Sequence, residues 1–326
     1  MDWAFTEEQE QLAGLVRQIL EREVTEERRR TIDATDERFD RALWTTLRSA
    51  GVFDGLGLIE LCRVFVELGR AVAPVPVAPV IAALQLGESE RIVTPALVDD
   101  PGAPVEAVGS VLTGAKTTVP AGMIADAFLV SASGAGAFLV EREAAGVSVS
   151  EQLVTSTEKE ALLELGAAQG AKVGGDEMEK ALADHLTVAI CAHQLGVCER
   201  ALELTAGYAK QRVQFDRPIA TFQAVGQRLA DAYIDVQGIR LTLWQAAWRL
   251  AEGLDADQEI ATAKFWAADA GHRIAHTAVH VHGGMGIDLD YHLHRYFTAA
   301  KRNEFALGGA TEQLVKIGRT LATEPA

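Results

Sequence analysis

Apolar residues recur at helical spacing in the first part of the chain. The stripe begins at Phe5 and runs to Leu20, and Thr6 stands where a side-chain cap for this helix is needed, ahead of two glutamates. Further helices are expected over 38–49 and 58–69. The run APVPVAP follows, and its proline density should end any helix there. The opening part of the chain is therefore predicted to be helical.

Short apolar runs replace this spacing from about residue 89 to residue 175. The runs are separated by glycines and prolines, and they lie at 111–116, 127–130, 137–140 and 147–149. Runs of this length with turn residues between them are typical of strands joined by turns. The middle of the chain is therefore predicted to be a small sandwich or barrel.

Three long apolar stripes follow, over 182–208, 225–250 and 260–281. Their residues step by three or four, which is typical of antiparallel helices with short connections, and the C-terminal helix completes a four-helix bundle. The predicted fold class is mainly α with a small β domain. The predicted domains are an N-terminal helical domain (1–88), a reduced middle β domain (89–175) and a C-terminal four-helix bundle (176–326).

The chain of 326 residues carries a net charge of −16. A nucleic-acid backbone or an anionic membrane would repel so acidic a surface, so neither is expected as a partner. No apolar run reaches 18 residues, and the acidic N-terminus lacks the basic start of a secretory signal. The three cysteines, Cys62, Cys191 and Cys198, are expected to be reduced buried thiols in a cytoplasmic protein.

The residues YAKQRVQFDRPIATFQ, which start at Tyr208, carry the most specific chemistry. Pro218 prevents the preceding helix from continuing, so Arg212 and Phe215 are expected on a short, sharply turning loop. An arginine fork suits a pyrophosphate, and a phenylalanine ring offers a flat face to adenine or ribose. Gln223 has both a donor and an acceptor for a polar cofactor edge. The alternative is that Arg212 is a surface ion-pair residue and Phe215 an ordinary core residue.

The order R-x-x-F-x-x-P-I-x-x-F-Q between two long helices resembles the flavin-contacting signature of acyl-CoA dehydrogenases, in which one subunit reaches across to a neighbour's FAD. The resemblance spans nearly the whole chain, because FTEEQ, ELGRAVAP and LTGAKTTV also follow the family's order. The succession of helical, β and helical regions agrees with it. The resemblance implies FAD as the cofactor, with Arg212, Phe215, Phe222 and Gln223 among the residues that contact it.

A second element ends the third long stripe and reads HVHGGMGI from His280. The paired glycines, Gly283 and Gly284, let a backbone approach a ligand closely, although a simple glycine helix cap is the alternative. In the family this segment lies against the adenosine and pyrophosphate half of a neighbour's FAD, and His280 stands where glutamine is usual. The segment follows a helix and not a strand, so it is not the glycine motif of a dinucleotide-binding fold.

Three histidines spaced four apart, His272, His276 and His280, are compatible with a metal site on one helical face. Helical H-x-x-x-H can bind zinc, but a site needs a third ligand and an ordered shell around it, and the cysteines are far away in sequence. The family places this face at a cofactor interface. Interface histidines are therefore expected, and no metal.

The catalytic base of the family has no counterpart in this chain. Removing a proton from the carbon beside a thioester carbonyl requires a carboxylate over that carbon. In most of the family a glutamate near the C-terminus serves, and its position falls on Leu307, or on Gly308 if the alignment slips by one. In some members the base is on the first bundle helix, where this chain has Leu186. The flavin-ring segments are also shortened, so no catalytic residue is predicted.

These retained and lost segments together resemble the short, non-base subunit of heterotetrameric (α2β2) acyl-CoA dehydrogenases, several of which act in bacteria on CoA thioesters of steroid side chains. The resemblance implies a subunit that serves the FAD of a longer, base-carrying partner, with an acyl-CoA substrate and an electron-transfer flavoprotein as acceptor. Two alternatives stay open: a self-sufficient homotetrameric dehydrogenase with a displaced base such as Glu304, and a non-enzymatic scaffold of the same fold.

Overall fold

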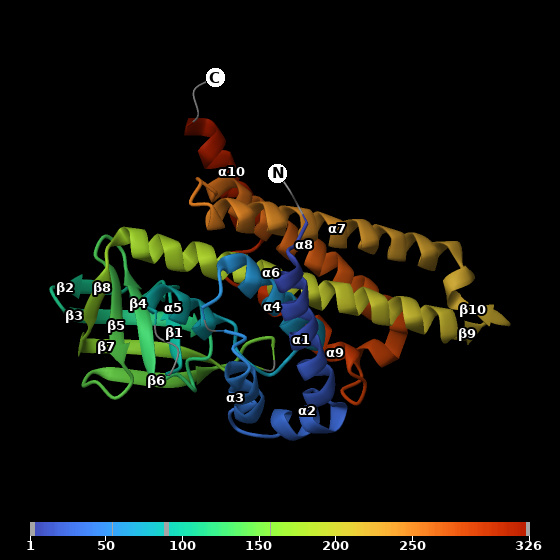
Figure 1. The fold of residues 1–326 in the computed structure, drawn as a ribbon, viewed down its shortest axis with the longest axis horizontal. Helices are drawn as coiled ribbons and strands as arrows, with labels where there is room; N and C mark the ends of the chain where they lie inside the picture. The colour runs from blue at the N-terminus through green and yellow to red at the C-terminus, as the bar shows by residue number, and fades with distance from the viewer. Residues whose placement is uncertain (1–3, 54, 88–90, 157, 324–326) are drawn as a thin grey trace. The chain divides into compact units, whose positions relative to one another are not determined.

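A computed structural model describes residues 4–53, 55–87, 91–156 and 158–323. Helices come first along the chain, strands follow and long helices return, so the predicted fold class is confirmed (Figure 1). The residues group into two compact units. The helical unit comprises the described parts of Met1–Arg29, Leu56–Ala73 and Ile190–Ala326, and the β-containing unit comprises those of Arg30–Gly55 and Pro74–Ala189. The linear division into three domains stays a prediction.

The N-terminal helix of the helical unit, α1 (Glu7–Glu23), packs against α4 (Leu58–Ala71). Thr6 caps α1 as predicted: its hydroxyl accepts a hydrogen bond from the Gln9 N–H, and the Gln9 side chain accepts one from the Thr6 N–H. This reciprocal pair satisfies backbone donors that a helix N-terminus otherwise leaves open. The predicted cap is therefore confirmed.

The three predicted stripes are the long helices α6 (Asp176–Gln211), α7 (Gln223–Ala251) and α8 (Asp257–His282). α7 runs beside α8, and α8 also packs against α9 (Leu293–Phe305) and α10 (Ala310–Thr323) (Figure 1). The expectation of a single C-terminal helix is wrong. Leu307 and Gly308 adopt positive φ angles, 56° and 98°, which an α-helix cannot contain, so the chain breaks between α9 and α10.

The β-containing unit holds two four-stranded sheets. The first has the order β1 (Val93–Ala96), β4 (Ala127–Ala132), β5 (Gly136–Glu141) and β8 (Ala171–Gly174), with β1 and β4 parallel. The second has the order β2 (Glu106–Val108), β3 (Val111–Val119), β7 (Glu160–Gln169) and β6 (Val147–Gln152), all antiparallel. The four predicted apolar runs lie in β3, β4, β5 and β6. The other four strands of these sheets, β1, β2, β7 and β8, were not predicted.

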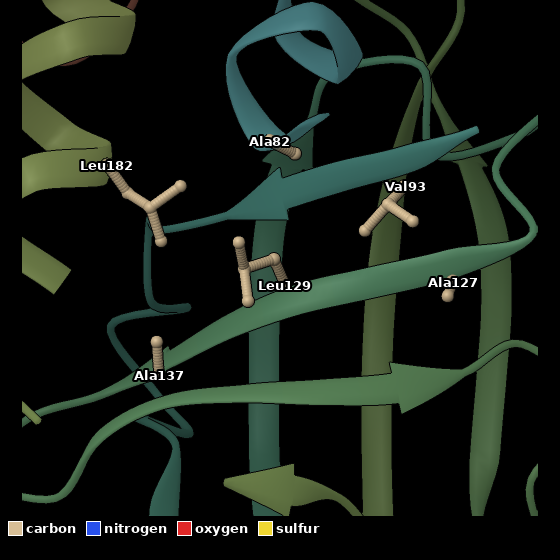
Figure 2. Close-up of a cluster of buried hydrophobic side chains, with 6 residues drawn as sticks. All are labelled: Ala82, Val93, Ala127, Leu129, Ala137 and Leu182. Carbon is tan, nitrogen blue, oxygen red and sulfur yellow. The ribbon is translucent and has the colours of Figure 1, made fainter. Parts of the chain in front are cut away.

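An apolar core joins the first sheet to two helices of the same unit. Figure 2 shows its buried side chains converging from α5 (Ala78–Leu86), β1, β4, β5 and the first turns of α6: Ala82, Val93, Ala127, Leu129, Ala137 and Leu182. The proline run ends α4 at Ala71, as predicted, whereas α5, which begins at Ala78 inside that run, was not predicted. Pro79 lies in the first turn of α5, where the missing N–H of proline costs no hydrogen bond.

Two shorter helices precede α4. The first, α2 (Glu26–Asp33), was not predicted, because its residues are almost all polar and leave no apolar stripe. The second, α3 (Arg41–Ser49), begins three residues later than predicted, with Asp40 as its N-cap. Such differences at helix ends are expected, since the cap and not the stripe decides where a helix begins.

α6 is long and apolar enough to cross a membrane by length and composition alone, but 72% of its apolar window is buried inside the protein. Burial of this extent is typical of a core helix. The cysteines Cys62, Cys191 and Cys198 are buried and form no disulfide, as predicted. Burial raises the pKa of the Cys62 and Cys198 thiols, so neither is a reactive thiolate.

α4 and α6 cross so closely that only glycines fit at the crossing. A Cβ added to Gly196 would lie 1.9 Å from the Val66 carbonyl oxygen and 2.8 Å from the Arg70 nitrogen. A Cβ added to Gly69 would lie 2.1 Å from the His193 carbonyl oxygen. Side-chain atoms do not approach backbone atoms at these distances, so the two helix backbones meet directly.

Near this crossing, buried polar side chains tie α6 to α8 and α9. Asn303 Nδ2 donates to His193 Nδ1 (2.9 Å) and to Gln194 Oε1 (2.9 Å). Lys264 is fully buried, and its Nζ donates to the carbonyl oxygens of Asn303 and Glu304 (3.0 Å each) at the end of α9. Burial lowers the pKa of His193 to about 3 and that of Lys264 to about 8. The neutral His193 ring can thus accept from Asn303, and Lys264 holds the last carbonyls of α9.

Replacing Gly196 with alanine should force α4 and α6 apart and lower the free energy of unfolding by about 2–4 kcal/mol, because the added methyl group meets backbone atoms. Gly207 is a matched control on the same helix, since a Cβ there meets nothing within 4 Å. Gly207→Ala should raise the free energy of unfolding by about 0.5–1 kcal/mol through helix propensity. Urea unfolding measures both changes, and equal midpoints for the two variants would contradict a tight crossing.

Candidate functional site

The segment after α6 folds into a hairpin with a two-residue turn. β9 (Val213–Gln214) pairs with β10 (Arg217–Pro218), and Phe215 and Asp216 connect them. Both connecting residues have positive φ, 52° and 62°, as in a type I′ turn, which usually takes Asn-Gly. For Phe215 this conformation costs roughly 1–2 kcal/mol, whereas the short polar side chain of Asp216 tolerates it better. The strained turn holds the Phe215 ring at the tip, where 86% of the residue is exposed.

Arg212 lies at the base of this hairpin. Its backbone N–H donates to the Tyr208 carbonyl oxygen (2.8 Å), and its own carbonyl oxygen accepts from the Ile219 N–H (2.8 Å). The side chain is exposed, and within the described part of the chain it has no ion pair or hydrogen bond. Arg212 is therefore not an ion-pair residue within the described chain, and Phe215 is not a core residue.

A pocket of about 290 Å³ lies between the hairpin, the start of α7 and the end of α8. Its wall consists of Gln214, Phe215, Ile219, Phe222, Ala224, Val225, Arg228, His280 and Val281. Three of the predicted site residues, Phe215, Phe222 and His280, are thus brought together. A largely apolar wall with a few polar groups is typical of small-molecule sites.

Aromatic rings and cations combine at this pocket. The Phe215 and Phe222 rings meet nearly at right angles (81°), with centroids 6.1 Å apart. The Arg217 guanidinium lies over the Phe222 ring, 4.2 Å from its centroid. Arg228 was not predicted; it lies one turn after Ala224 on the same face of α7, and this spacing was the available signal. Flat apolar faces beside cations suit an aromatic, negatively charged ligand.

Four predicted residues lie outside the pocket wall: Arg212, Gln223, Gly283 and Gly284. Gln223 is exposed as the first residue of α7, directly after the wall residue Phe222. The N-cap position at Phe222 makes no side-chain hydrogen bond, so the helix end offers backbone N–H groups toward solvent. Such a helix end favours negatively charged groups.

The glycine pair follows the end of α8 at the 3₁₀ turn η2 (Gly283–Ile287). Gly283 has a φ of 63°, which favours glycine, whereas a Cβ on Gly284 would meet nothing within 4 Å. The packing of this chain therefore gives no reason for glycine at Gly284. Open space in front of two exposed glycines fits a group that approaches the backbone from outside, such as a cofactor phosphate or a neighbouring chain.

The two segments of the site are fixed to each other by His282, which is buried, unlike His280. Its Nδ1 lies 2.8 Å from the Ala278 carbonyl oxygen, and its ring stacks on Tyr208 with centroids 4.3 Å apart. Tyr208 belongs to the last turn of α6, just before the hairpin. The stacked pair therefore holds the end of α6 against the end of α8.

The exposed histidines lie beside a charged cluster. His272 and His276 have ring centroids 4.3 Å apart, and His272 Nδ1 lies 3.2 Å from both carboxylate oxygens of Glu304. Lys301 Nζ also donates to Glu304 (2.6 Å). Within residues 4–53, 55–87, 91–156 and 158–323, no group of three histidine, cysteine or acidic side chains is arranged to hold a metal ion.

The two positions expected for the family's base, Leu307 and Leu186, carry no acid in this chain. Leu307 lies in the break between α9 and α10, and Leu186 is buried in α6. Of the nearby carboxylates, Glu304 is engaged as described, Glu312 accepts from the Gly309 N–H at the start of α10, and Asp184 pairs with Lys180 (2.5 Å). These carboxylates already hold structural partners.

Comparisons with known proteins agree on one family. Residues 176–321 match the model of the acyl-CoA dehydrogenase C-terminal domain. The acyl-CoA dehydrogenase FadE27 of Mycobacterium tuberculosis is 47% identical, with all of both chains covered. A chain of the ChsE4-ChsE5 complex from Mycobacterium tuberculosis is 47% identical over all of both chains, with a TM-score of 0.96. A chain of the Tcur3481-Tcur3483 steroid ACAD variant is 37% identical over 97% of this chain and 98% of that one, with a TM-score of 0.91.

The order of the helices and strands, the hairpin after α6 and the full-length likeness to FadE27 lead to one conclusion. The chain belongs to the acyl-CoA dehydrogenase family.

Proposed function

We propose that this chain is the non-base subunit of a heteromeric FAD-dependent acyl-CoA dehydrogenase and binds the adenosine and pyrophosphate half of a partner's FAD. The observation that carries the proposal is the hairpin pocket, where Phe215, Phe222 and His280 meet close to an exposed Arg212. Members of the family bind FAD, which accepts the hydride that the substrate loses. The contribution of this chain is binding and orientation.

The hairpin would hold the charged and aromatic parts of the cofactor. Arg212, outside the pocket wall, would donate charged hydrogen bonds to the pyrophosphate, and Arg228 would add a cation in the wall itself. Phe215 and Phe222 would pack against the adenosine, because their perpendicular rings offer a face and an edge. In a chain with a net charge of −16, such a local group of cations is needed to attract an anionic cofactor.

Polar and small residues would complete the site. Gln223 and His280 are exposed and carry donors and acceptors for the polar edges of the cofactor. Gly283 and Gly284 would let the backbone approach a phosphate, since no side chain intervenes. The open space in front of these glycines supports this role.

The proton-accepting group is assigned to a longer partner subunit. Leu307 and Leu186 cannot accept a proton, and Glu304 is held by Lys301 and His272. The partner would supply the base and the flavin-ring pocket in an α2β2 complex, and an electron-transfer flavoprotein would accept the electrons. A solved ChsE4-ChsE5 complex and a steroid ACAD among the relatives support a heteromer that desaturates a steroid side-chain CoA ester.

The stoichiometry of the cofactor tests this proposal. A complex with two copies of each subunit should hold two FAD, because this chain would serve the partner's cofactor and lack a flavin-ring pocket of its own. Flavin absorbance combined with the mass of the purified complex gives the ratio. Four fully occupied sites would overturn the assignment of the ring pocket to the partner, and a complex without flavin would favour a scaffold.

Arg212→Ala should weaken the retention of FAD by about ten- to a hundredfold, which corresponds to a charged contact worth about 1.5–3 kcal/mol. Gly284→Val should have a similar effect, because its side chain would occupy the open space in front of the backbone. Arg319→Ala, on the exposed face of α10, is the matched control and should retain flavin normally. Normal flavin content in both site variants would mean that the segment is structural.

Glu304→Gln and Asp184→Asn should each lower the turnover of the complex by less than about tenfold, whereas loss of a true general base costs about 10²–10⁴-fold. The chain without its partner should fail to dehydrogenate any acyl-CoA, even in the presence of FAD. Steady-state turnover and flavin content are measured together. A collapse of turnover in Glu304→Gln with flavin still bound would favour the self-sufficient enzyme with a displaced base.

A further inference from the structure

A second cavity, of about 410 Å³, lies within the helical unit, and its wall shares no residue with the hairpin pocket. Helices α1, α2, α4, α6 and α9 contribute to the wall. Five arginines line it: Arg17, Arg29, Arg70, Arg200 and Arg295. Only three acids, Glu21, Glu26 and Glu67, share the wall with them. The wall therefore holds more arginines than acids in a chain whose net charge is −16, and Arg70 and Arg200 also pair with Glu203 outside the wall.

Ion pairs hold these arginines in position before any ligand binds. Arg17 donates to both carboxylate oxygens of Glu67 (3.0 and 2.7 Å), a residue whose side chain is only 3% exposed. Arg295, itself buried, donates to Glu26 (2.8 Å). The two acids are thereby neutralised, and the guanidinium groups are oriented by fixed partners.

Arg29 is fixed by the end of a helix. It is buried, and its Nη1 donates to the Val72 carbonyl oxygen (2.5 Å), just after the last residue of α4. Val72 has a φ of 43°, so the chain turns sharply there and presents its carbonyl oxygen. A cation at this point also complements the negative end of the helix dipole.

Two of the arginines remain accessible from solvent. The side chain of Arg200 is 44% exposed and that of Arg17 is 51% exposed. An anion that enters the cavity can therefore reach guanidinium groups that are held in place yet not covered. Arginine is the side chain best suited to such contacts, since its planar fork matches carboxylate and phosphate oxygens.

The wall also holds a nitrogen without a partner. His292 Nε2 is buried, and within the described residues no hydrogen bond to it is found. Burial lowers the pKa of His292, so its ring is neutral at pH 7. A buried polar atom that lacks a partner is costly, and a ligand oxygen would satisfy it.

The remaining wall is apolar and includes Leu20, Val24 and Leu204. From the arginines, the unpartnered nitrogen and this apolar surface, we propose that the cavity binds a small amphiphilic anion. Its carboxylate or phosphate head would lie among Arg17, Arg200 and His292, and its apolar body would lie against the leucines. This site does not depend on the proposed FAD contacts, which lie at the hairpin pocket.

Isothermal titration calorimetry of the full chain with inorganic phosphate, octanoate and octyl phosphate tests the proposal. One of the two amphiphiles should bind with a dissociation constant roughly tenfold lower than that of inorganic phosphate, because only the amphiphiles reach the apolar wall. The preferred head group decides between a carboxylate and a phosphate ligand. Arg200→Gln should weaken that binding by about tenfold or more, through loss of a charged contact.

Two further variants separate the cavity from general surface charge. Leu204→Trp should abolish binding by filling the cavity while keeping every arginine, and Arg22→Gln should leave binding unchanged, because Arg22 lies on α1 outside the wall. Circular dichroism checks that each variant folds. The proposal is overturned if neither amphiphile binds at about 10 mM, if Leu204→Trp binds normally, or if Arg22→Gln and Arg200→Gln behave alike.

Discussion

The contact of two helix backbones at Gly69 and Gly196 is the constraint on which the helical unit depends. No side chain separates α4 from α6 there, and His193, which lies on α6 at this crossing, is buried. A buried polar ring needs a partner within the protein, and Asn303 on α9 supplies it. Lys264 on α8 then binds the last carbonyls of α9. This close crossing is thus accompanied by buried polar contacts that involve two further helices, α8 and α9.

Much of the fold could be predicted, because stripes of three- and four-residue steps over many turns indicate long helices with little ambiguity. Prediction failed where the local signal was weak. β7 is held by strands on both sides, and its sequence alone does not show them. The break at Leu307 and Gly308 is stabilised by buried Gln313, whose side chain donates to both carbonyl oxygens (3.2 Å each). Nonlocal contacts of this kind leave no periodic pattern.

The order of the motifs along the sequence predicts part of the candidate site. The motifs indicated a sharply turning loop and a glycine turn, and the structure brings Phe215, Phe222 and His280 to one pocket. The motif ends before Arg228 and therefore does not predict it, although Arg228 lies on the face of α7 that lines the pocket. The motif also could not show the left-handed backbone of Phe215, since pairing of the flanking strands imposes that conformation.

A hairpin that holds Phe215 and Asp216 in left-handed conformations is already ordered before a partner arrives. Ordering a flexible loop on binding costs roughly 1–2 kcal/mol of backbone entropy per residue, whereas this loop has been ordered by folding. A ligand or partner that contacted the tip would therefore meet a backbone of fixed shape, because the turn cannot change its conformation without disturbing the pairing of β9 with β10. The backbone of the tip would add selectivity for shape to the selectivity for charge that Asp216 and Arg217 provide.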